Sequence, residues 1–355
     1  MANFVLLDFL HEASRRKIDE IYIVPGTPIH IRSRGKMVKA GEALTPADTE
    51  RIIREIYELA KRKIDDGLYE KGDDNFSFTL PGVSRFRVSL FRQRNSFGCI
   101  LRMIAFSLPS PEELHIPPEV MNAANLSNGL VLAAGYSGSG KTTTLASIVQ
   151  QVNRTKAGGT LITLENPLEY LHSHGRCIVI QREIYKDTAD YSEGIEAVLY
   201  QRPDLLLISD LPTAEVVRQT MRAANTGQLI LSTLYGESSS DAIEGLLTMF
   251  PLNEQPLICG QLARVLKMMI FQRMVPNAEG GNIPIFESVE IDSVLRELLH
   301  KNDMEGFKNA IAHSKAAGVV PFDRNLVRAF RQQQITFDTA LEYAMDKAAV
   351  RRMIH

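Results

Sequence analysis

The sequence predicts an α/β protein, in which a small α+β module precedes an α/β domain and a helical C-terminal segment. Short apolar runs alternate with helical patterns between Asn125 and Pro276, which is typical of a sheet covered by helices on both faces. The region before it mixes helical and hairpin patterns, and the segment after Asp292 is almost wholly helical. The chain has 355 residues, more than one ordinary core organises, so we expect two or three domains.

Composition and charge argue against several classes of protein. An apolar content of 45% and a charged content of 23% are those of a soluble globular protein, and a net charge of −2 gives no general attraction to nucleic acid or anionic lipid. The three cysteines, Cys99, Cys177 and Cys259, lack metal-site spacing, so we expect reduced thiols in the core. We expect neither a signal peptide nor a membrane span, because the first residues lack a cleavage site and no apolar run is long enough.

The N-terminal region reads as a small α+β module that ends near Pro117-Pro118. Leucines recur at helical spacing in its first segment, Pro25-Gly26 marks a hairpin, and Thr45 is a good helix N-cap. Apolar and basic side chains alternate along its last predicted strand. The predicted elements are, in order, a helix over Phe4–Lys17, strands over Glu20–Val24 and Ile29–Ser33, a helix over Pro46–Tyr69, and strands over Phe76–Thr79 and Arg85–Phe91.

A strand, a glycine-rich loop and a helix are predicted in succession between Gly129 and Asn153. The loop from Gly135 to Thr142 fits the spacing G-x-x-x-x-G-K-[ST], in which glycines let successive N–H groups turn towards phosphate oxygens. We therefore predict a nucleoside triphosphate site in which Lys141 contacts the β- and γ-phosphates and Thr142 binds Mg²⁺. The flanking strand and helix disfavour the alternative, a Gly/Ser-rich surface loop. The predicted nucleotide contacts are Gly135, Ser137, Gly138, Ser139, Gly140, Lys141, Thr142 and Thr143.

Acidic residues follow two of the predicted buried strands. Glu165 comes directly after the strand over Gly159–Leu164, and Asp210 follows the strand over Leu205–Ser209. Because α/β sheets bind ligands at the carboxyl ends of their strands, we predict that Glu165 and Asp210 organise Mg²⁺ and the attacking water. Alternatively, either acid is a solvent-facing strand end. The further predicted elements are strands over Cys177–Gln181, Gln228–Thr233 and Pro284–Glu290, and helices over Ser192–Tyr200 and Asn253–Ile270.

Arginines gather in the N-terminal module, where no acidic residue occurs between Asp74 and Glu112. The cluster consists of Arg85, Arg87, Arg92, Arg94 and Arg102. Three roles are open: binding nucleic acid, pairing with acids elsewhere, or contacting the triphosphate of a neighbouring subunit. We favour the nucleotide contact, because the guanidinium group suits phosphate geometry and arginine fingers recur in phosphoryl transfer.

Six segments together resemble the type IV pilus retraction ATPases, the PilT group of the type II/IV secretion ATPases. They are GYSGSGKTTTL, TLENPLEY, QREIYKDT, RPDLLLISD, AANTGQLILSTLY and PGVSRFRVSLFRQR. The resemblance covers nearly the whole chain. It implies a PAS-like N-terminal domain (residues 1–116), a short linker (108–120), a RecA-like P-loop ATPase domain (117–290) and a helical C-terminal segment (291–355).

The resemblance also implies the ligands, the assembly and the roles of particular residues. ATP and Mg²⁺ are the implied ligands, with Thr142, Glu165 and Asp210 at the metal and Asp210 at the end of the Walker B-like strand. Arg87 and Arg102 stand where arginines are thought to reach the nucleotide. The implied assembly is a cytoplasmic hexameric ring at the inner-membrane pilus base, which meets a platform protein and drives pilus retraction and twitching motility. Two further segments match, namely the acidic one with Glu165 and Glu169, and Asp292–Lys301, where retraction enzymes carry a motif needed for pulling.

Several residues depart from the family pattern. Asp210 replaces the usual catalytic glutamate, and Asn166 replaces the acid that usually follows Glu165. A shift of about 1 Å in a positioned group can cost on the order of 10²-fold in rate. The other departures are Leu211-Pro212-Thr213 after the base, and Tyr185, Gln228 and Tyr235 at positions usually held by histidine. Every feature needed to hold MgATP remains, so nucleotide binding is expected and the rate of hydrolysis is left open.

These features leave three functions open. The first is an active pilus retraction motor. The second is a hydrolysis-impaired accessory or regulatory paralogue, which binds nucleotide and works with a second, active retraction ATPase. The third, a RecA-type ATPase that translocates nucleic acid, draws only on the arginine cluster and the shared fold, and we expect no nucleic acid partner.

Overall fold

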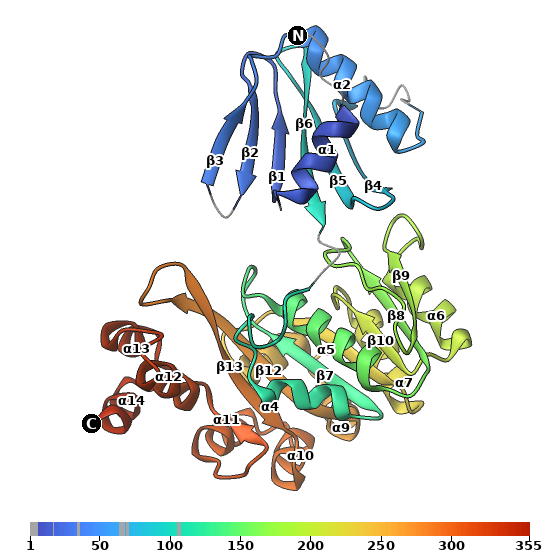
Figure 1. Ribbon diagram of the computed structural model, residues 1–355. Coiled ribbons are helices and arrows are strands. Elements are labelled where there is room, and N and C mark those ends of the chain that lie inside the picture. Colours follow the sequence, from blue (N-terminus) through green and yellow to red (C-terminus); the bar gives the residue numbers. More distant parts are fainter. Residues whose placement is uncertain (1–5, 17, 34–35, 64–67, 69–70, 105–107) are drawn as a thin grey trace. The chain divides into compact units, whose positions relative to one another are not determined.

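The computed structural model describes residues 6–16, 18–33, 36–63, 68, 71–104 and 108–355. Its contacts divide the chain into two compact units, whose helices and strands Figure 1 shows. Buried apolar clusters form separately within each unit. The first unit comprises Met1–Ser107 with Glu169–Leu171, and the second comprises Leu108–Leu168 with His172–His355. The C-terminal segment shares the core of the second unit. The three-part division at residues 116 and 290 stays a prediction.

The first unit is built on a six-stranded sheet in the order β3-β2-β1-β6-β5-β4. Every neighbouring pair of strands is antiparallel. Helices α1 and α2 pack on one face of this sheet (Figure 1). There Leu10 and Ile52 belong to the same buried cluster as Phe86. The bounds are α1 Leu6–Arg15, β1 Glu20–Ile23, β2 Ile29–Ser33, β3 Lys36–Ala40, α2 Pro46–Leu59, β4 Asp73–Leu80, β5 Ser84–Gln93 and β6 Ser96–Ile104.

Strand β5 confirms the predicted alternation of apolar and basic side chains. Its apolar residues are buried, whereas Arg85 and Arg87 lie on the opposite, partly exposed face. Strands β3 and β6 complete the sheet, although no strand was predicted at either place. Phe4 and Lys17, the predicted limits of the first helix, lie outside the described residues.

Helix α2 is shorter than predicted. It begins after Thr45, whose hydroxyl accepts from the Asp48 N–H at 3.2 Å, while the Asp48 carboxylate accepts from the Thr45 N–H at 2.9 Å. This capping box confirms the predicted start. The helix ends at Leu59, because Lys61 adopts a left-handed backbone conformation with φ 53°. The predicted end at Tyr69 lies outside the described residues.

The second unit is built on an eight-stranded sheet in the order β14-β13-β12-β7-β11-β10-β8-β9. Strands β12, β7, β11, β10, β8 and β9 run parallel to one another. At one edge of the sheet, β13 pairs antiparallel with β12, and β14 pairs antiparallel with β13. The predicted α/β class is thereby confirmed. The strand bounds are β7 Gly129–Ala134, β8 Thr160–Glu165, β9 Ile178–Glu183, β10 Leu205–Ile208, β11 Leu229–Leu234, β12 Leu266–Pro276, β13 Asn282–Glu290 and β14 Val319–Val320.

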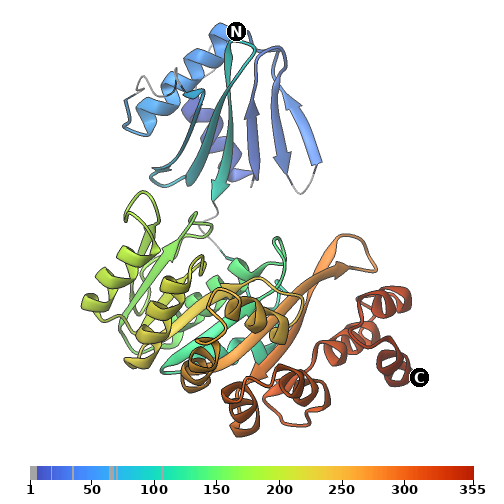
Figure 2. The same cartoon turned by 180° about the vertical axis from the view of Figure 1, so that it is seen from behind.

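Helices cover both faces of this sheet, so its central strands are wholly buried. In β7, Leu130 and Leu132 join a cluster with α6 to α9, whereas Val131 and Ala133 join another with α5. Figure 1 shows the face with α4 and α5, and Figure 2 shows the opposite face. The helix bounds are α4 Pro118–Met121, α5 Lys141–Thr155, α6 Tyr191–Gln201, α7 Ala214–Asn225, α8 Ser239–Leu247, α9 Gln255–Val265, α10 Ser293–His300, α11 Met304–His313, α12 Phe322–Arg331, α13 Phe337–Tyr343 and α14 Lys347–Ile354, with a 3₁₀ turn at Asn122–Asn125.

The parallel strands bring several predicted site residues to one edge of the sheet. Ile208 on β10 is level with Leu164 on β8 and with Ser232 on β11, and β11 is in register with β7. The loop after β7, Glu165 after β8 and Asp210 after β10 therefore leave the sheet at its carboxyl edge. This is the edge at which such sheets bind ligands.

The helix predicted over Asn253–Ile270 is wrong at its C-terminal end. Helix α9 ends at Val265, and Leu266–Ile270 begins strand β12, which pairs with β7. This apolar run fits a buried strand as well as a helix, and β7 decides the outcome by supplying a ladder of backbone hydrogen bonds. The helical tail is confirmed except for the short strand β14. No helix in the described parts of the chain is long and apolar enough to cross a bilayer.

Candidate nucleotide-binding site

Three glycines shape the loop between β7 and α5. Gly135, Gly138 and Gly140 have φ angles of 147°, 77° and 90°, which residues with a side chain rarely adopt. A methyl group on Gly135 would lie 2.3 Å from the backbone oxygen of Gln272, and one on Gly140 would lie 2.7 Å from its side-chain nitrogen. The predicted strand, loop and helix are present, and at Gly135 and Gly140 both conformation and space require glycine.

Lys141 opens helix α5 and folds back over the loop. Its ammonium group donates to the backbone oxygens of Gly135 at 2.7 Å and of Tyr136 at 2.8 Å. Burial lowers the pKa of Lys141, and the nearby Asp210 carboxylate acts in the opposite direction. The lysine predicted to contact phosphate thus lies at the loop, within electrostatic reach of the acid that follows β10.

The other predicted contacts differ in exposure. Ser137 and Gly138 are exposed at the tip of the loop, and Thr142 and Thr143 are half-buried in the first turn of α5. Ser139 is buried, and its hydroxyl has no hydrogen-bond partner among the described residues. A buried hydroxyl without a partner fits a site that completes its hydrogen bonds when a ligand or water enters.

Gln272 on β12 lies outside the motif, but its side chain hydrogen-bonds to the loop and to α5. Its side chain is buried; Nε2 donates to the Ser139 backbone oxygen at 2.6 Å, and Oε1 accepts from the Thr144 hydroxyl at 2.7 Å. The amide therefore joins the end of the loop to the first turn of α5. The sequence carries no local signal for this contact, because Gln272 and Thr144 are 128 residues apart.

Two tyrosines and a glutamate meet at the outer side of the loop. The Tyr136 hydroxyl donates to the Glu237 carboxylate, and its ring packs edge-on against Tyr235 with the ring centres 5.3 Å apart. The hydrogen bond to Glu237 raises the pKa of Tyr136 to about 12. Tyr235 and Glu237 follow β11, so this contact ties the loop after β7 to the loop after β11. Tyr136 and Glu237 were not predicted, since Tyr136 occupies a variable position of the motif.

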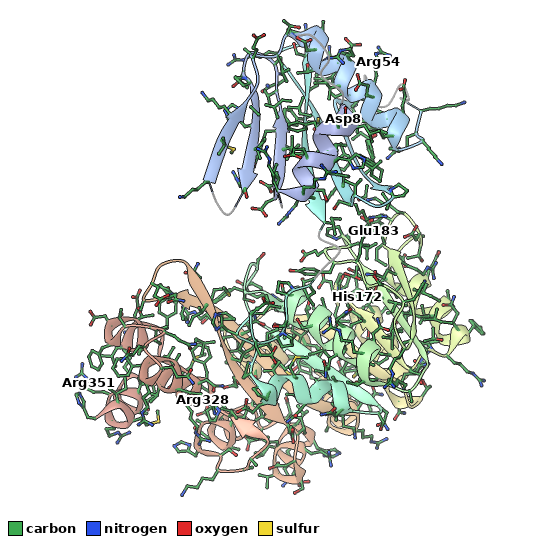
Figure 3. The ribbon with its side chains drawn as sticks, in the orientation of Figure 1. Asp8, Arg54, His172, Glu183, Arg328 and Arg351 are labelled. Carbon is green, nitrogen blue, oxygen red and sulfur yellow. The ribbon has the colours of Figure 1, made fainter. Side chains whose placement is uncertain are left out.

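Glu165 lies at the end of β8 and is buried. Its Oε1 accepts from the Thr163 hydroxyl at 2.6 Å and from the Gln181 amide at 3.3 Å, which fixes the direction of the carboxylate. Its neighbour in register on β9 is Glu183, which Figure 3 labels. Glu183 is also buried and pairs with Lys186 at 2.6 Å. Two acids therefore end adjacent strands, of which the sequence singled out only Glu165.

Asp210 follows β10 and is exposed. A buried tyrosine, Tyr191 on α6, lies within electrostatic reach of both Asp210 and Glu165 and hydrogen-bonds to Ser209 at 2.8 Å. Burial raises the pKa of Tyr191 to about 12, and both carboxylates act in the same direction. The structure thus gathers the two predicted acids around Tyr191, with Asp210 also near Lys141. Metal binding by these acids stays a prediction.

Arg87 and Arg102 lie in the first unit, opposite each other across β5 and β6. The Nε of Arg102 is 4.0 Å from a carboxylate oxygen of Glu20, which also pairs with Arg32 at 3.1 Å. Pairing with an acid, one of the three predicted roles, is therefore observed for Arg102. Contact of Arg87 and Arg102 with a nucleotide stays a prediction. Glu169 also belongs to the first unit.

A cavity of about 240 Å³ adjoins the loop. The cavity lies beside the end of the loop and the start of α5. The lining residues from the loop, α5 and β12 are Gly140, Thr143, Thr144, Gln272 and Met274, and those from the segment before α4 are Glu113, Leu114, His115 and Ile116.

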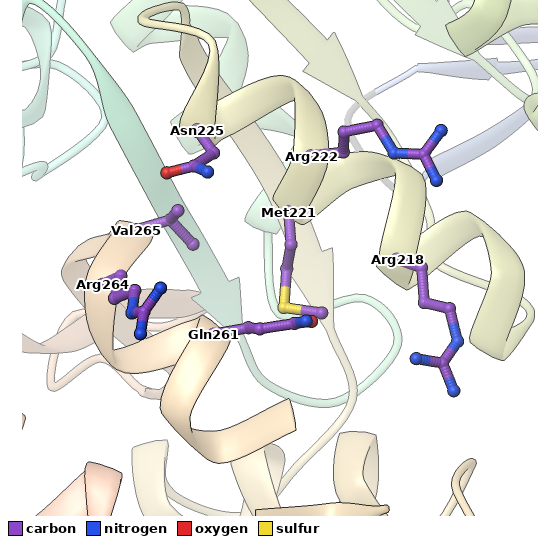
Figure 4. A pocket seen from close by; sticks show the side chains of 7 residues that line it. All are labelled: Arg218, Met221, Arg222, Asn225, Gln261, Arg264 and Val265. Carbon is purple, nitrogen blue, oxygen red and sulfur yellow. The ribbon is translucent and has the colours of Figure 1, made fainter. Parts of the chain in front are cut away.

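A second hollow, of about 330 Å³, lies between α7 and α9. Figure 4 shows Met221 and Gln261 extending towards each other from the two helices, with three arginines around them. Arg218 pairs with Glu254 and stacks on Phe250 at 4.9 Å. Helices α7 and α9 end where β11 and β12 begin, so the hollow lies at the opposite edge of the sheet from the glycine-rich loop. The remaining lining residues are Arg222, Asn225, Arg264 and Val265.

A parallel sheet that presents a glycine-rich loop, its lysine and an acid at the carboxyl edge defines a P-loop nucleotide-binding protein. The chain matches the family described as Type II/IV secretion system protein over residues 5–318, and it belongs to that family. It is 30% identical over 337 residues to the type IV pilus ATPase PilU of Pseudomonas aeruginosa, which covers 94% of this chain and 87% of PilU. It is 28% identical over 339 residues to the type IV pilus retraction ATPase PilT of the same organism, which covers 96% of this chain and 98% of PilT.

Solved structures show the same relationship. The crystal structure of the pilus retraction motor PilT with bound ADP is similar with a TM-score of 0.89 and 30% identity, and the match covers 99% of this chain and 100% of PilT. The Legionella pneumophila ATPase DotB is similar with a TM-score of 0.80 but only 20% identity, which supports the fold alone. The resemblance to the PilT group that the motifs indicated is confirmed.

Proposed function

We propose that this chain is an ATP-binding motor of the type IV pilus system, which couples MgATP binding and hydrolysis to rotation between its two units and drives pilus retraction and twitching motility. The observation that carries the proposal is the loop itself, shaped by glycines at left-handed angles and covered by Lys141. The similarity to PilT, a retraction motor whose structure contains ADP, supports the pilus as the place of action.

In the proposed mechanism, backbone N–H groups of the loop bind the phosphates. Lys141 exchanges the carbonyl oxygens of Gly135 and Tyr136 for oxygens of the β- and γ-phosphates. The Asp210 carboxylate accepts the proton of the attacking water, and the buried Glu165 holds the water in place. The oxygens of Thr142, Glu165 and Asp210 are of the type that Mg²⁺ prefers, and the ion would neutralise phosphate charge.

The proposed assembly is a homo-hexamer in the cytoplasm, peripheral to the inner membrane at the pilus base. A ring would let Arg87 and Arg102 of one subunit reach the nucleotide of the next, where guanidinium groups stabilise phosphate charge. Its partners would be an inner-membrane platform protein and, in the accessory role below, a second retraction ATPase.

A hydrolysis-impaired accessory protein is the second candidate function, and the residues around the base favour it. Asp210 is one bond shorter than the family's glutamate, and one of its oxygens accepts from the Leu211 N–H at 2.9 Å. Asn166, which donates its backbone N–H to Ser209 at 3.2 Å, has a side-chain amide that cannot act as a base. Nucleotide binding would survive these changes, while turnover would fall.

Steady-state phosphate release by the purified chain tests the proposal. The matched control is Lys141→Ala, which removes the ammonium group at the loop. A motor releases phosphate well above this control, because only the intact loop positions the γ-phosphate. A rate equal to the control would exclude the motor and leave the accessory function.

A double substitution tests the explanation for slow turnover. We predict that Asp210→Glu with Asn166→Asp raises the turnover number by about tenfold or more, because it returns a carboxylate to the reach expected of the base. Each single variant serves as a control for the other. Unchanged phosphate release by the double variant would contradict our interpretation of Asp210 and Asn166.

The nucleic-acid translocase is the least favoured function. The chain's net charge of −2 gives no general attraction to a polyanion, and Arg102 already lies near Glu20. We expect the ATPase rate to be the same with and without DNA or RNA. Stimulation by either polymer that weakens with added salt would reverse this ranking.

A further inference from the structure

Gln272 contacts the glycine-rich loop at its beginning, its end and the turn that follows. Its backbone oxygen lies 2.3 Å from the position that a methyl group on Gly135 would take. Its side-chain amide donates to Ser139 at 2.6 Å and accepts from Thr144 at 2.7 Å. A single residue of β12 therefore fixes the path of the loop relative to both β7 and α5.

The hydrogen bond to Ser139 also sets the direction of the next N–H group. The Ser139 oxygen and the Gly140 N–H belong to one trans peptide unit, in which the C=O and N–H bonds point in opposite directions. Because Gln272 draws the Ser139 oxygen towards β12, the Gly140 N–H is turned away from β12. That N–H is one of the groups that a phosphate-binding loop presents to its ligand.

We propose that Gln272 is a positioning residue for nucleotide binding, which holds the loop in its phosphate-binding shape before the ligand arrives. This inference rests on the proposed function and deepens it. Only an amide meets both hydrogen-bonding requirements at this position, because it has a donor for the Ser139 oxygen and an acceptor for the Thr144 hydroxyl in one planar group. Ionised glutamate has the same shape but lacks the donor, and methionine lacks both.

The variant Gln272→Glu tests the proposal, with Gln261→Glu as the matched control. Gln261 is exposed on α9 at the far edge of the sheet, so its substitution makes the same chemical change away from the loop. We expect Gln272→Glu to weaken binding of ATP and of pyrophosphate about tenfold or more in calorimetry, because a carboxylate oxygen faces the Ser139 oxygen and turns the peptide. Gln261→Glu should bind both ligands like the unmodified chain.

A second pair of variants covers the case in which Gln272→Glu does not fold. Thr144→Val removes the donor to the Gln272 oxygen and keeps the side-chain shape, whereas Thr144→Ser keeps the hydroxyl. We expect severalfold weaker ATP binding for Thr144→Val and restored binding for Thr144→Ser. The melting temperature of each variant without ligand separates packing from positioning, because a residue that only packs the core lowers this temperature and leaves the dissociation constant unchanged.

The outcomes distinguish this inference from the proposed function. If the unmodified chain binds neither ATP nor pyrophosphate, both fail. If it binds them and Gln272→Glu and Thr144→Val bind equally well, the positioning role of Gln272 is wrong and the proposed function stands.

Discussion

Glu287 carries a carboxyl group into the core of the second unit, where β13 meets α8 and α12. It is only 7% exposed, and its oxygens accept from the Ser239 hydroxyl at 2.6 Å and from the Phe322 N–H at 3.4 Å. Burial raises the pKa of Glu287, and these hydrogen bonds offset the rise only in part. The ionised form is therefore disfavoured in the folded protein.

This raised pKa predicts a specific dependence of stability on pH. A carboxyl group whose folded pKa exceeds its unfolded value of about 4.3 contributes stability below that value and loses it as pH rises through the folded pKa. The loss is about 1.4 kcal/mol for each pH unit that separates the two pKa values. We predict that the free energy of unfolding falls less between pH 4 and pH 8 in Glu287→Gln than in the unmodified chain. Urea titrations across this range measure it, and parallel curves for the two proteins would contradict the prediction.

The three cysteines confirm the expectation that they are core residues with free thiols. Cys99, Cys177 and Cys259 are all buried and unpaired by disulfides, and burial raises the pKa of Cys99 to about 12. Because the thiolate is the reactive form, we predict that a thiol reagent such as dithionitrobenzoate reacts slowly with the native protein and rapidly with all three cysteines in guanidinium chloride. Fast reaction of any cysteine in the native protein would show that its core opens readily.

The glycine-rich loop between β7 and α5 tolerates substitution least among the segments described above. We predict that Gly135→Ala lowers the melting temperature and abolishes ATP binding, because the new methyl group would meet the Gln272 backbone oxygen at 2.3 Å in addition to the strain of its φ angle. Gly227→Ala is the matched control. Gly227 also has a positive φ, of 95°, but no described residue outside its chain neighbours lies within 4 Å of the position that a Cβ atom would take.

This control separates the steric clash of the new methyl group from the strain of its backbone conformation. Gly227→Ala should cost about 1–2 kcal/mol of stability, as expected for a left-handed residue that gains a side chain, and should still bind ATP. Equal losses of stability and of binding in both variants would show that conformation alone accounts for the glycine, and that β12 does not press on the loop.

The elements also show which features the sequence could reveal. The loop and Lys141 were predictable because the motif is contiguous and its flanking strand and helix are local patterns. Strand β12 was mistaken for helix in its first residues, because the apolar run after Val265 suits either structure and only its place next to β7 decides. Gln272 was missed for the same reason, since its contacts with Ser139 and Thr144 exist only once the strand order is known.

The predicted site residues are divided between the two compact units of the chain. Lys141, Glu165 and Asp210 belong to the second unit, and Arg87 and Arg102 to the first. Sequence patterns assign each residue to its element, but they do not say whether one subunit or two build a nucleotide site. That question concerns assembly, and it requires an experiment that mixes subunits.

Mixed assemblies of two inactive variants make this test. If the arginines of one subunit act on the nucleotide of its neighbour, subunits with Lys141→Ala and subunits with both Arg87→Ala and Arg102→Ala should restore activity to each other. An intact site then forms wherever a subunit with Lys141 adjoins a neighbour with both arginines. In a cyclic ring assembled at random from equal amounts of the two variants, about a quarter of the interfaces meet this condition. We predict that phosphate release in the mixture, after exchange of subunits, reaches about a quarter of that of the unmodified chain.

Each variant alone, at the same total concentration, supplies the baseline. Rescue depends on assembly, so it should disappear on dilution below the concentration at which the proposed ring forms, while the residual rates of the separate variants do not change. Activity of the mixture equal to the mean of the separate variants, in a sample shown by mass to contain both subunits in one ring, would mean that Arg87 and Arg102 serve their own subunit or only the sheet of the first unit. In that case the charged row of Arg32, Glu20 and Arg102 would be structural. Residues other than Arg87 and Arg102 would then have to couple neighbouring subunits.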